Sequence, residues 1–408
     1  MNTHQERMLK PAIVLATHTM GLGVIRALGS MGVPVVAIYY DHHKDMGYVS
    51  KYVKHKVYVP HPEQAEDEFL AQLIELAPRF GGGLLIPASD ETLVTVSRHR
   101  DLLARHYVVA CAEWDITRRL IDKKYSYALA ESIGVAVPKT FTPLSLEDVK
   151  SYGKTIEYPC LVKPCQSHLF FARFGRKMVP VENLKQMLVV YQQAVDAGLD
   201  IMLQEIIPGD DTHVVNYNSY FWGGQPLVEF TAQHLRKTPP DFGSPCVAVS
   251  KKISEVMEPG RRILQAMGFY GYSCTEFKKD SRDGSYKLME VNGRHNLSTL
   301  LAVHCGINFP WLHYRHLVEG VAPEQTNFRE NFYWIDMERD LPFISQRFFK
   351  RGESLGHLLS PYLNPHVFAV YDSQDPKPFY KRYADFSKNA VNRLFQNTKQ
   401  SNQLEKLS

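Results

Sequence analysis

Short apolar runs alternate with amphipathic stretches at the start of the chain. Residues 12–16 are all apolar, residues 21–31 carry apolar positions at helical spacing, and residues 33–39 are again mostly apolar. A strand, a helix and a second strand in this order predict a parallel pair joined by a right-handed crossover. Apolar runs at 84–87 and 107–110 predict later strands of the same sheet. We therefore expect an α/β domain with a parallel sheet here.

The pattern changes near residue 119. A helix is predicted over 122–134, and short strands are predicted at 160–164 and 202–207. Strands then dominate residues 214–249, with a two-residue glycine turn between two of them. Antiparallel strands mixed with helices predict α+β lobes after the first domain. The predicted segments are an α/β domain at 1–118, a small lobe with a lead-in helix at 119–208, a large lobe with the metal site at 209–325, a C-terminal segment packing on the core at 326–387, and a polar tail at 388–408.

Two acidic segments separated by a turn-rich stretch are the most informative feature of the chain. Residues 274–277 and 288–294 predict adjacent strands of a hairpin, because residues 279–285 between them are rich in turn-forming types. Side chains on one face of a hairpin stand opposite each other. We therefore expect Glu276 and Glu290 to point at one spot.

Asn292 follows Glu290 by two residues, which places it on the same face of the predicted strand. Two carboxylates and an amide oxygen are hard ligands that suit Mg²⁺, or Mn²⁺ in its place, when the ion also holds a nucleotide phosphate. Arg294 continues on this face and can meet a transferring phosphoryl group. The alternative is a polar, solvent-facing hairpin with a chance pair of glutamates.

Composition narrows the class of protein. The chain has 408 residues with a formal net charge of +4, too small an excess to predict binding to nucleic acid or to an anionic membrane. No apolar stretch reaches the length of a transmembrane segment, and the polar first ten residues predict no secretory signal. The six cysteines lie far apart without C-x-x-C spacing, so reduced thiols in a cytoplasmic enzyme are expected.

Two turns in the first domain carry weaker signals. Residues 18–23 contain a G-x-G turn that could serve a nicotinamide dinucleotide, with Asp41 on the ribose. The third glycine of that motif is missing, so a structural turn is favoured. Ser89, Asp90 and Glu91 follow a predicted strand and open a helix. They predict either a helix N-cap or a group that faces a cleft and contacts the substrate.

The order of the motifs resembles the ATP-grasp superfamily. Lys123 begins a helix, Lys163 lies on a strand before Pro164, Gln204 and Glu205 end another strand, and the acidic hairpin with Arg294 follows. The resemblance covers roughly residues 1–320 and is greatest to the carboxylate-amine ligases, particularly those of the D-aspartate ligase type. It implies a doubly wound, Rossmann-like pre-ATP-grasp domain followed by a two-lobed ATP-grasp fold with α+β lobes. The implied reaction is ATP-dependent formation of an amide or peptide-like bond through an acylphosphate, with ADP and phosphate as products.

The resemblance also implies contacts for individual residues. The implied ATP contacts are Lys123 and Lys163 at the phosphates, Gln204, Glu205, Ile206 and Ile207 at the adenine, and Asp211 and His213 at the ribose. Lys163 lies between apolar residues and is hard to explain without an anion. The other positions have ordinary alternatives: Lys123 as a solvated helix start, Glu205 as the end of an edge strand, and Asp211 and His213 as turn residues.

The chain departs from the family in its phosphate loop. Many ATP-grasp enzymes carry a glycine-rich loop after the lysine strand, but residues 165–177 contain a single glycine. Arg173, Arg176 or Lys177 can replace the backbone donors of such a loop, or can face solvent.

Substrate contacts are predicted in two places. The proline-containing stretch 234–243 presents Arg236, whose guanidinium can hold a substrate carboxylate or the transferred phosphate. Ser298 and Thr299 follow Arg294 closely and can donate to substrate or cap a helix. Lys163, Arg236 and Arg294 are the residues expected to stabilise charge during the reaction.

The expected partners are a small carboxylate and an amine: an amino acid, a peptide or a cell-envelope precursor. A homodimer is the default for such enzymes. Three rival functions remain open: another ATP-grasp chemistry, meaning carboxylation or phosphoryl transfer to a hydroxyl; a nicotinamide oxidoreductase; and a non-catalytic nucleotide-binding module.

Overall fold

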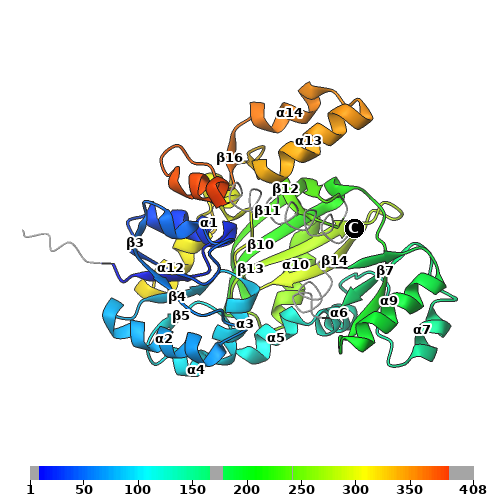
Figure 1. The fold of residues 1–408 in the computed structure, drawn as a ribbon, viewed down its shortest axis with the longest axis horizontal. Helices are drawn as coiled ribbons and strands as arrows, with labels where there is room; N and C mark the ends of the chain where they lie inside the picture. Colours follow the sequence, from blue (N-terminus) through cyan, green and yellow to red (C-terminus); the bar gives the residue numbers. More distant parts are fainter. Residues whose placement is uncertain (1–8, 166–177, 241, 386–408) are drawn as a thin grey trace, which may run out of the picture.

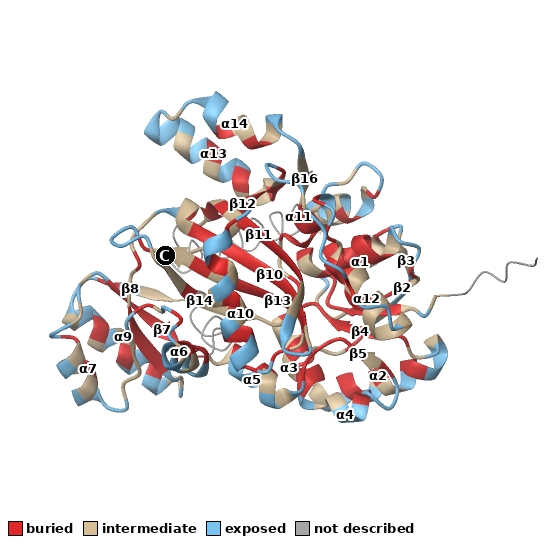
Figure 2. Ribbon diagram, turned by 180° about the vertical axis from the view of Figure 1, so that it is seen from behind, coloured by how far each residue is buried: buried red, intermediate tan, exposed pale blue. Residues whose placement is uncertain are grey.

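Three β-sheets organise the chain in a computed structural model that describes residues 9–165, 178–240 and 242–385 (Figure 1). The sheet that begins first along the chain has five strands, the next has four and the last has seven. Most of the strand positions are buried between the layers (Figure 2).

The first sheet is parallel and has the strand order β3-β2-β1-β4-β5. Its strands are β1 (Ala12–Leu15), β2 (Val35–Tyr39), β3 (Val53–Tyr58), β4 (Leu84–Pro87) and β5 (Val108–Val109). The connecting helices are α1 (Thr19–Gly29), α2 (Glu66–Phe80), α3 (Asp90–Arg98) and α4 (Arg100–Leu103). The predicted doubly wound domain is thereby confirmed. The edge strand β3 was not predicted, because its lysine and histidine positions are exposed and break the apolar run.

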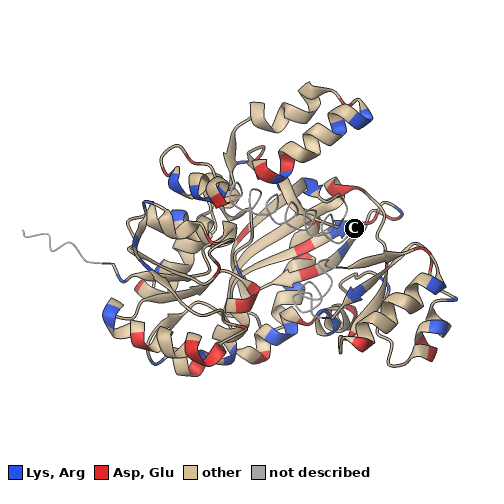
Figure 3. Ribbon diagram, viewed as in Figure 1, with Lys and Arg blue, Asp and Glu red and all other residues tan. Residues whose placement is uncertain are grey.

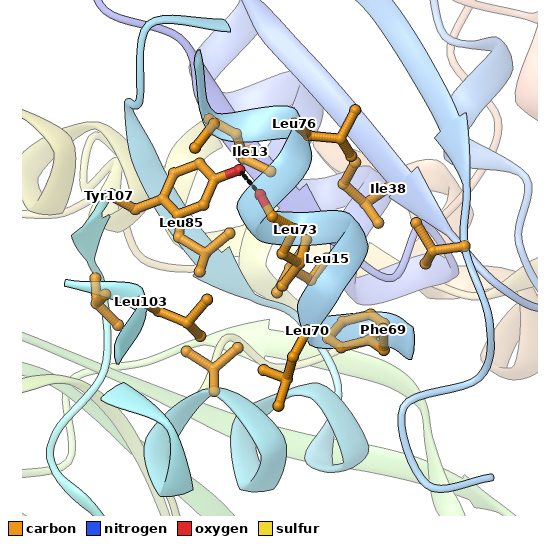
Figure 4. Close-up of a cluster of buried hydrophobic side chains, with 14 of the residues drawn as sticks. Ile13, Leu15, Ile38, Phe69, Leu70, Leu73, Leu76, Leu85, Leu103 and Tyr107 are labelled. Atoms are coloured by element: carbon orange, nitrogen blue, oxygen red, sulfur yellow. Dashed lines mark hydrogen bonds between the residues drawn. The ribbon is translucent and has the colours of Figure 1, made fainter. Parts of the chain in front are cut away.

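The core of this domain forms where α2 packs on the sheet (Figure 4). Ile13 and Leu15 of β1 meet Phe69 and Leu73 of α2, and all four are fully buried or nearly so. The hydroxyl of Tyr107 donates to the carbonyl of Leu73 at 2.5 Å, which satisfies the one polar atom of a buried ring. The layer thus holds the carboxyl ends of β1 and β4 in fixed positions.

The second sheet is antiparallel, with the order β6-β9-β7-β8. Its strands are β6 (Thr140–Phe141), β7 (Cys160–Pro164), β8 (Val179–Val181) and β9 (Ile201–Glu205). Helices α7 (Leu146–Tyr152) and α9 (Leu184–Asp196) cover it, and α5 (Trp114–Ile121) and α6 (Lys123–Ser132) lead into it. Asp122 caps α6 by accepting from the backbone of Lys124, so the predicted helix begins where expected.

The third sheet has the order β14-β13-β10-β11-β12-β15-β16. Its first five strands along the chain are β10 (Val214–Trp222), β11 (Gln225–Thr238), β12 (Ser244–Ser250), β13 (Gly271–Lys279) and β14 (Tyr286–Asn292). Helices α10 (Met257–Ala266), α11 (Thr299–His304) and α12 (Phe309–Glu319) pack around it. The predicted two-residue turn joins β10 to β11, since Trp222 pairs with Gln225.

The C-terminal segment extends the third sheet. Strands β15 (Tyr333–Ile335) and β16 (His366–Phe368) form its edge, and helices α13 (Met337–Arg351) and α14 (Leu355–Leu363) project between them (Figure 1). Asp375 then meets Arg26 of α1 in a buried ion pair at 3.0 Å. The segment therefore packs both on the sheet and on the first domain. The predicted segment boundaries themselves remain predictions, and the polar tail lies outside the described residues.

None of the helices in the described part of the chain combines the length and the apolar character that crossing a membrane requires.

Candidate active site

A cavity of about 520 Å³ lies among the three sheets, and most of the residues singled out from the sequence line it. The predicted residues found in its lining are Asp90, Lys123, Lys163, Glu205, Ile206, Ile207, Glu276, Glu290, Asn292, Arg294 and Ser298. Acidic segments stand out on the otherwise largely uncharged strands of the third sheet (Figure 3). Basic side chains nevertheless outnumber acidic ones in the lining, which favours an anionic ligand.

The acidic hairpin has the predicted register. Glu276 of β13 lies directly opposite Glu290 of β14, and Cys274 lies opposite Asn292. Nδ2 of Asn292 donates to Oε1 of Glu290 at 3.1 Å, so the amide oxygen is the atom of Asn292 that can act as a ligand. The hairpin thus brings two carboxylates and an amide to one wall of the cavity.

Both glutamates have a lysine beside them. Nζ of Lys123 lies 3.0 Å from Oε2 of Glu290, and Nζ of Lys237 lies 3.8 Å from Oε1 of Glu276. Burial alone would lower the pKa of Lys123, but the Glu290 carboxylate outweighs it and the pKa is raised. Lys123 is therefore a permanent cation at this wall.

The donor set fits Mg²⁺ in a substrate complex. Among the described residues, no group of three or more His, Cys, Asp or Glu side chains could by itself hold a metal. Mg²⁺ in phosphate-transfer sites is commonly held by one or two carboxylates together with substrate phosphates and water. Glu276, Glu290 and Asn292 match that requirement better than they match a closed structural site.

Lys163 reaches the cavity from the second sheet. The side chain is 4% exposed, and Nζ donates to the hydroxyl of Tyr127 at 3.0 Å and to Oε1 of Gln204 at 3.3 Å. Gln204 is held in turn by Thr140, to whose hydroxyl its amide donates at 2.8 Å. These neutral partners orient the ammonium without neutralising it, so Lys163 can attract an anion in the cavity.

The connection between the two lobes supplies a second side of the cavity. Glu205, Ile206 and Ile207 follow β9 and line it. Both carboxylate oxygens of Glu205 have partners: Oε1 accepts from the backbone of Lys139 at 2.8 Å, and Oε2 lies 2.9 Å from Nη2 of Arg282. Arg282 belongs to the turn of the acidic hairpin, so Glu205 fastens the second sheet to the third.

Arg294 meets the first domain across the cavity. Its Nε and Nη2 donate to the two oxygens of Asp90 at 2.6 and 2.8 Å. Burial opposes ionisation of Asp90, but the Arg294 guanidinium outweighs burial and lowers the pKa of this carboxyl. Ser89 caps α3 through a capping box with Thr92, so the predicted cap is confirmed. The cap leaves Asp90 in the first turn, at the cavity.

The structure contradicts the predicted role of Arg236. The residue does not line the cavity, and it is 7% exposed on the side of β11 that faces the C-terminal helices. Its Nη1 lies 3.0 Å from Oδ2 of Asp340, and its Nη2 donates to the carbonyl of Leu358 at 2.6 Å. The register of β11 against β12 is irregular on both sides of Arg236, between His234 and Arg236 and again between Arg236 and Lys237. Simple alternation therefore fails to tell which residues face the cavity.

Four other predicted residues lie outside the cavity lining, and their contacts with ligands remain predictions. Gln204 lies behind Lys163, and Asp211 accepts from the backbone of Lys237 at 2.8 Å. His213 bonds Asp210 at 3.0 Å. The hydroxyl of Thr299 donates to the carbonyl of Asn296 at 2.7 Å, as a local helix-start contact.

The G-x-G turn has a structural explanation. A Cβ on Gly21 would lie 2.0 Å from the carbonyl oxygen of Ala16, so only glycine lets α1 pass so close to β1. The carboxylate of Asp41 accepts from the backbone of His43 and Lys44 and does not line the cavity. These contacts favour the structural turn over a nicotinamide site.

Several cavity residues were missed from the sequence. His234 and Lys237 lie three positions apart on β11 and both line the cavity, because the irregular register turns both to the same side. Neither ring nitrogen of His234 has a hydrogen-bond partner among the described residues, and burial lowers the pKa of this imidazole well below its usual value. The ring is therefore neutral. The other lining residues that were missed include His18, Asn216, Lys278, Arg339 and Arg382.

The predicted replacements for the glycine-rich loop, Arg173, Arg176 and Lys177, lie outside the described residues.

Comparison with known proteins gives one relative in sequence. A D-aspartate ligase from Enterococcus faecium (strain Aus0004) is 25% identical over 244 residues, which cover 55% of this chain and 56% of the relative. The match thus spans little more than half of that enzyme. No family model matches the chain.

Solved structures share the fold at lower identity. The biotin carboxylase domain of the Hydrogenobacter thermophilus 2-oxoglutarate carboxylase, solved with MgADP and bicarbonate, has a TM-score of 0.63 at 18% identity and covers 80% of this chain and 74% of its own. An L-amino acid ligase from Bacillus licheniformis has a TM-score of 0.60 at 15% identity, with 77% and 75% covered. The likeness covers about four fifths of this chain and shows a shared fold.

Proposed function

We propose that this chain, which has the ATP-grasp fold, is an ATP-dependent ligase that joins a carboxylate to an amine. The observation that carries the proposal is the wall formed by Glu276, Glu290 and Asn292, with Lys123 and Lys163 beside it in one cavity. The likeness to a D-aspartate ligase and to an L-amino acid ligase supports the choice of this reaction within the fold.

Each residue has a distinct task in the proposed reaction. A substrate carboxylate attacks the terminal phosphorus of ATP and forms an acylphosphate with release of ADP, and an amine then displaces phosphate. Glu276, Glu290 and Asn292 would hold Mg²⁺, which supplies charge neutralisation at the phosphate oxygens. Lys123 and Lys163 attract the triphosphate, and positioning with charge neutralisation accounts for most of the catalysis.

Arg294 is proposed to stabilise the transferred group. It follows the metal-binding residues on the same strand end and reaches across the cavity to Asp90. Its guanidinium can offer two parallel donors to a phosphoryl or carboxylate group. Ser298 lies beside it in the lining and can donate to the same substrate. Glu205 and the backbone of Ile206 and Ile207 are proposed to contact the adenine, because they line the cavity at the connection between the lobes.

The reaction is tested by ADP formation from ATP and Mg²⁺ with a panel of amino acids, small peptides and other carboxylates, singly and in pairs. The ligase proposal predicts ADP only with a particular acid and amine, together with an amide product detected by mass. Glu290→Gln keeps the size of the side chain and should reduce the rate by at least about a hundredfold. Glu75→Gln, at an exposed position of α2 outside the cavity lining, is the matched control.

Carboxylation is the second candidate, because the fold is shared with a biotin carboxylase solved with bicarbonate. ADP formation that depends on bicarbonate, without an amine, would favour it over ligation. Phosphate retained on the product would identify phosphoryl transfer, and ATP binding without turnover under every condition would identify a non-catalytic nucleotide-binding module.

A further inference from the structure

The C-terminal segment contributes two arginines to the cavity. They belong neither to the acidic hairpin nor to the elements that carry Lys123 and Lys163. Arg339 lies in the first turn of α13, and Arg382 lies beyond β16. Both line the same cavity as Glu276 and Lys163. The sequence predicted that this segment packs on the core, and the cavity lining connects it with the site as well.

The guanidinium of Arg339 is only partly used by the protein. Its Nε lies 3.5 Å from Oδ2 of Asp336, whereas its Nη1 is buried and has no hydrogen-bond partner among the described residues. A buried donor without a partner is costly, so native structures rarely retain one without a reason. In a cavity wall, such a donor can be satisfied by a ligand.

Arg382 adds a second cation beside it. Its Nε lies 2.5 Å from Oε2 of Glu338, the residue before Arg339, and its side chain is 24% exposed. Burial raises the pKa of the Asp336 carboxyl, and the guanidinium groups of Arg339 and Arg382 both oppose that rise, so Asp336 lies near both of them. The two arginines therefore lie close enough to act on one anion.

Near each arginine in the sequence, a buried ion pair made by another residue anchors that part of the chain. Asp340 follows Arg339, has a fully buried side chain, and binds Arg236 at 3.0 Å and the hydroxyl of Tyr362 at 2.9 Å. Asp375, seven residues before Arg382, has a fully buried side chain and binds Arg26 at 3.0 Å and the hydroxyl of Ser50 at 2.7 Å. Anchoring of this kind lowers the entropy lost when a side chain binds a ligand.

We propose that Arg339 and Arg382 form a subsite for an anionic group of a substrate, a carboxylate or a phosphate, other than the triphosphate of ATP. The inference rests on the proposed ligase function and narrows its substrate class: one of the two substrates carries an anion that does not react. Bidentate guanidinium groups suit both oxyanions. Arg236 is then a positioning residue, which acts on Arg339 through Asp340.

The test measures binding to the full chain with Mg²⁺ and a non-hydrolysable ATP analogue, by calorimetry. The probes are matched pairs that differ in one anion: aspartate and asparagine, glutamate and glutamine, O-phosphoserine and serine, with inorganic phosphate alone. The anionic member of at least one pair is expected to bind at least about tenfold more tightly, and Arg339→Gln and Arg382→Gln should each abolish that preference. The pair that shows it distinguishes a carboxylate from a phosphate.

Arg351→Gln is the matched control, because Arg351 lies at the other end of α13, is exposed and does not line the cavity. The proposal is overturned if no anionic member is preferred, or if the preference survives both substitutions. It is also overturned if the substitutions weaken binding of the ATP analogue instead, since the arginines would then serve the triphosphate. Failure of the ligase function has a different signature: no acid and amine pair produces ADP, whatever the state of Arg339.

Discussion

Arg294 and Asp90 form a two-point ion pair across the cavity although 204 positions separate them, with distances of 2.6 and 2.8 Å. The contact joins the residues just after β14 to the first turn of α3 in the first domain. Asp90 is 45% exposed, so the pair contributes less than about 1 kcal/mol to stability. The main effect of the ion pair is therefore to hold the Arg294 side chain at the cavity, where the first domain and the third sheet meet.

Asp90→Asn is expected to lower kcat/KM about ten- to hundredfold while leaving the affinity for ATP within about twofold, since the guanidinium loses its fixed direction but the nucleotide residues are unchanged. Steady-state kinetics together with ATP titration measure both quantities. Asp101→Asn, at an exposed position of the same domain outside the cavity lining, is the control. A large fall in thermal stability with normal kinetics would instead assign Asp90 a purely structural role.

Arg236→Met should destabilise the protein and leave ATP binding intact. The ion pair with Asp340 is buried, and removing one partner of such a pair costs about 3–5 kcal/mol because the other charge remains unpaired. Urea unfolding measures this cost. The double variant Arg236→Met with Asp340→Asn should be less destabilised than the sum of the two single variants. Additive losses would mean that the two residues do not act as a pair.

Gln204→Leu should weaken ATP binding without changing the choice of base. The Gln204 side chain supports Lys163 at 3.3 Å and does not line the cavity. Loss of the support allows the ammonium to shift, so affinities for ATP and GTP should fall by a similar factor of about ten. Competition binding of the two nucleotides checks this ratio. A change in the affinity for only one of the two nucleotides would instead support the predicted contact between Gln204 and the adenine.

Local patterns in the sequence predicted the elements that bury continuous apolar surface. The acidic hairpin is the clearest case, because strand alternation alone places Glu276, Glu290 and Asn292 on one face. The hairpin also has an irregularity, between Glu276 and Phe277, but it leaves Glu276 opposite Glu290. The Arg236 prediction failed for a different reason: a loop was expected at 234–243, whereas β11 continues to Thr238 and has a register irregularity on both sides of Arg236.

Contacts between distant segments could not be predicted from the sequence, for a different reason. Arg339 reaches the cavity because β15 and β16 pair with the edge of the third sheet and Asp340 binds Arg236. Each of these contacts is set by tertiary packing, and short strands such as Tyr333–Ile335 carry too few residues for a clear pattern. The C-terminal segment could therefore be predicted to pack on the core but not to enter the site.

Acid should destabilise the protein through buried neutral histidines. Burial lowers the pKa of His313 to about 3, whereas the unfolded chain binds this proton near pH 6.5. Between these two values the unfolded state holds more protons, so stability is lost as the pH falls from about 6.5 toward 3 and is fully present above 6.5. His234 and His295 are shifted in the same direction by burial and add to the slope.

Each such histidine contributes up to roughly 1.4 kcal/mol per pH unit in that window. His313→Gln should therefore flatten the loss of stability measured by urea unfolding at pH 7.5, 6 and 5, even if the variant is less stable at pH 7.5. His43→Gln, at an exposed position, should leave the slope unchanged. An identical slope in the His313 variant would show that the imidazole takes up its proton in the folded state, and that burial does not keep it neutral.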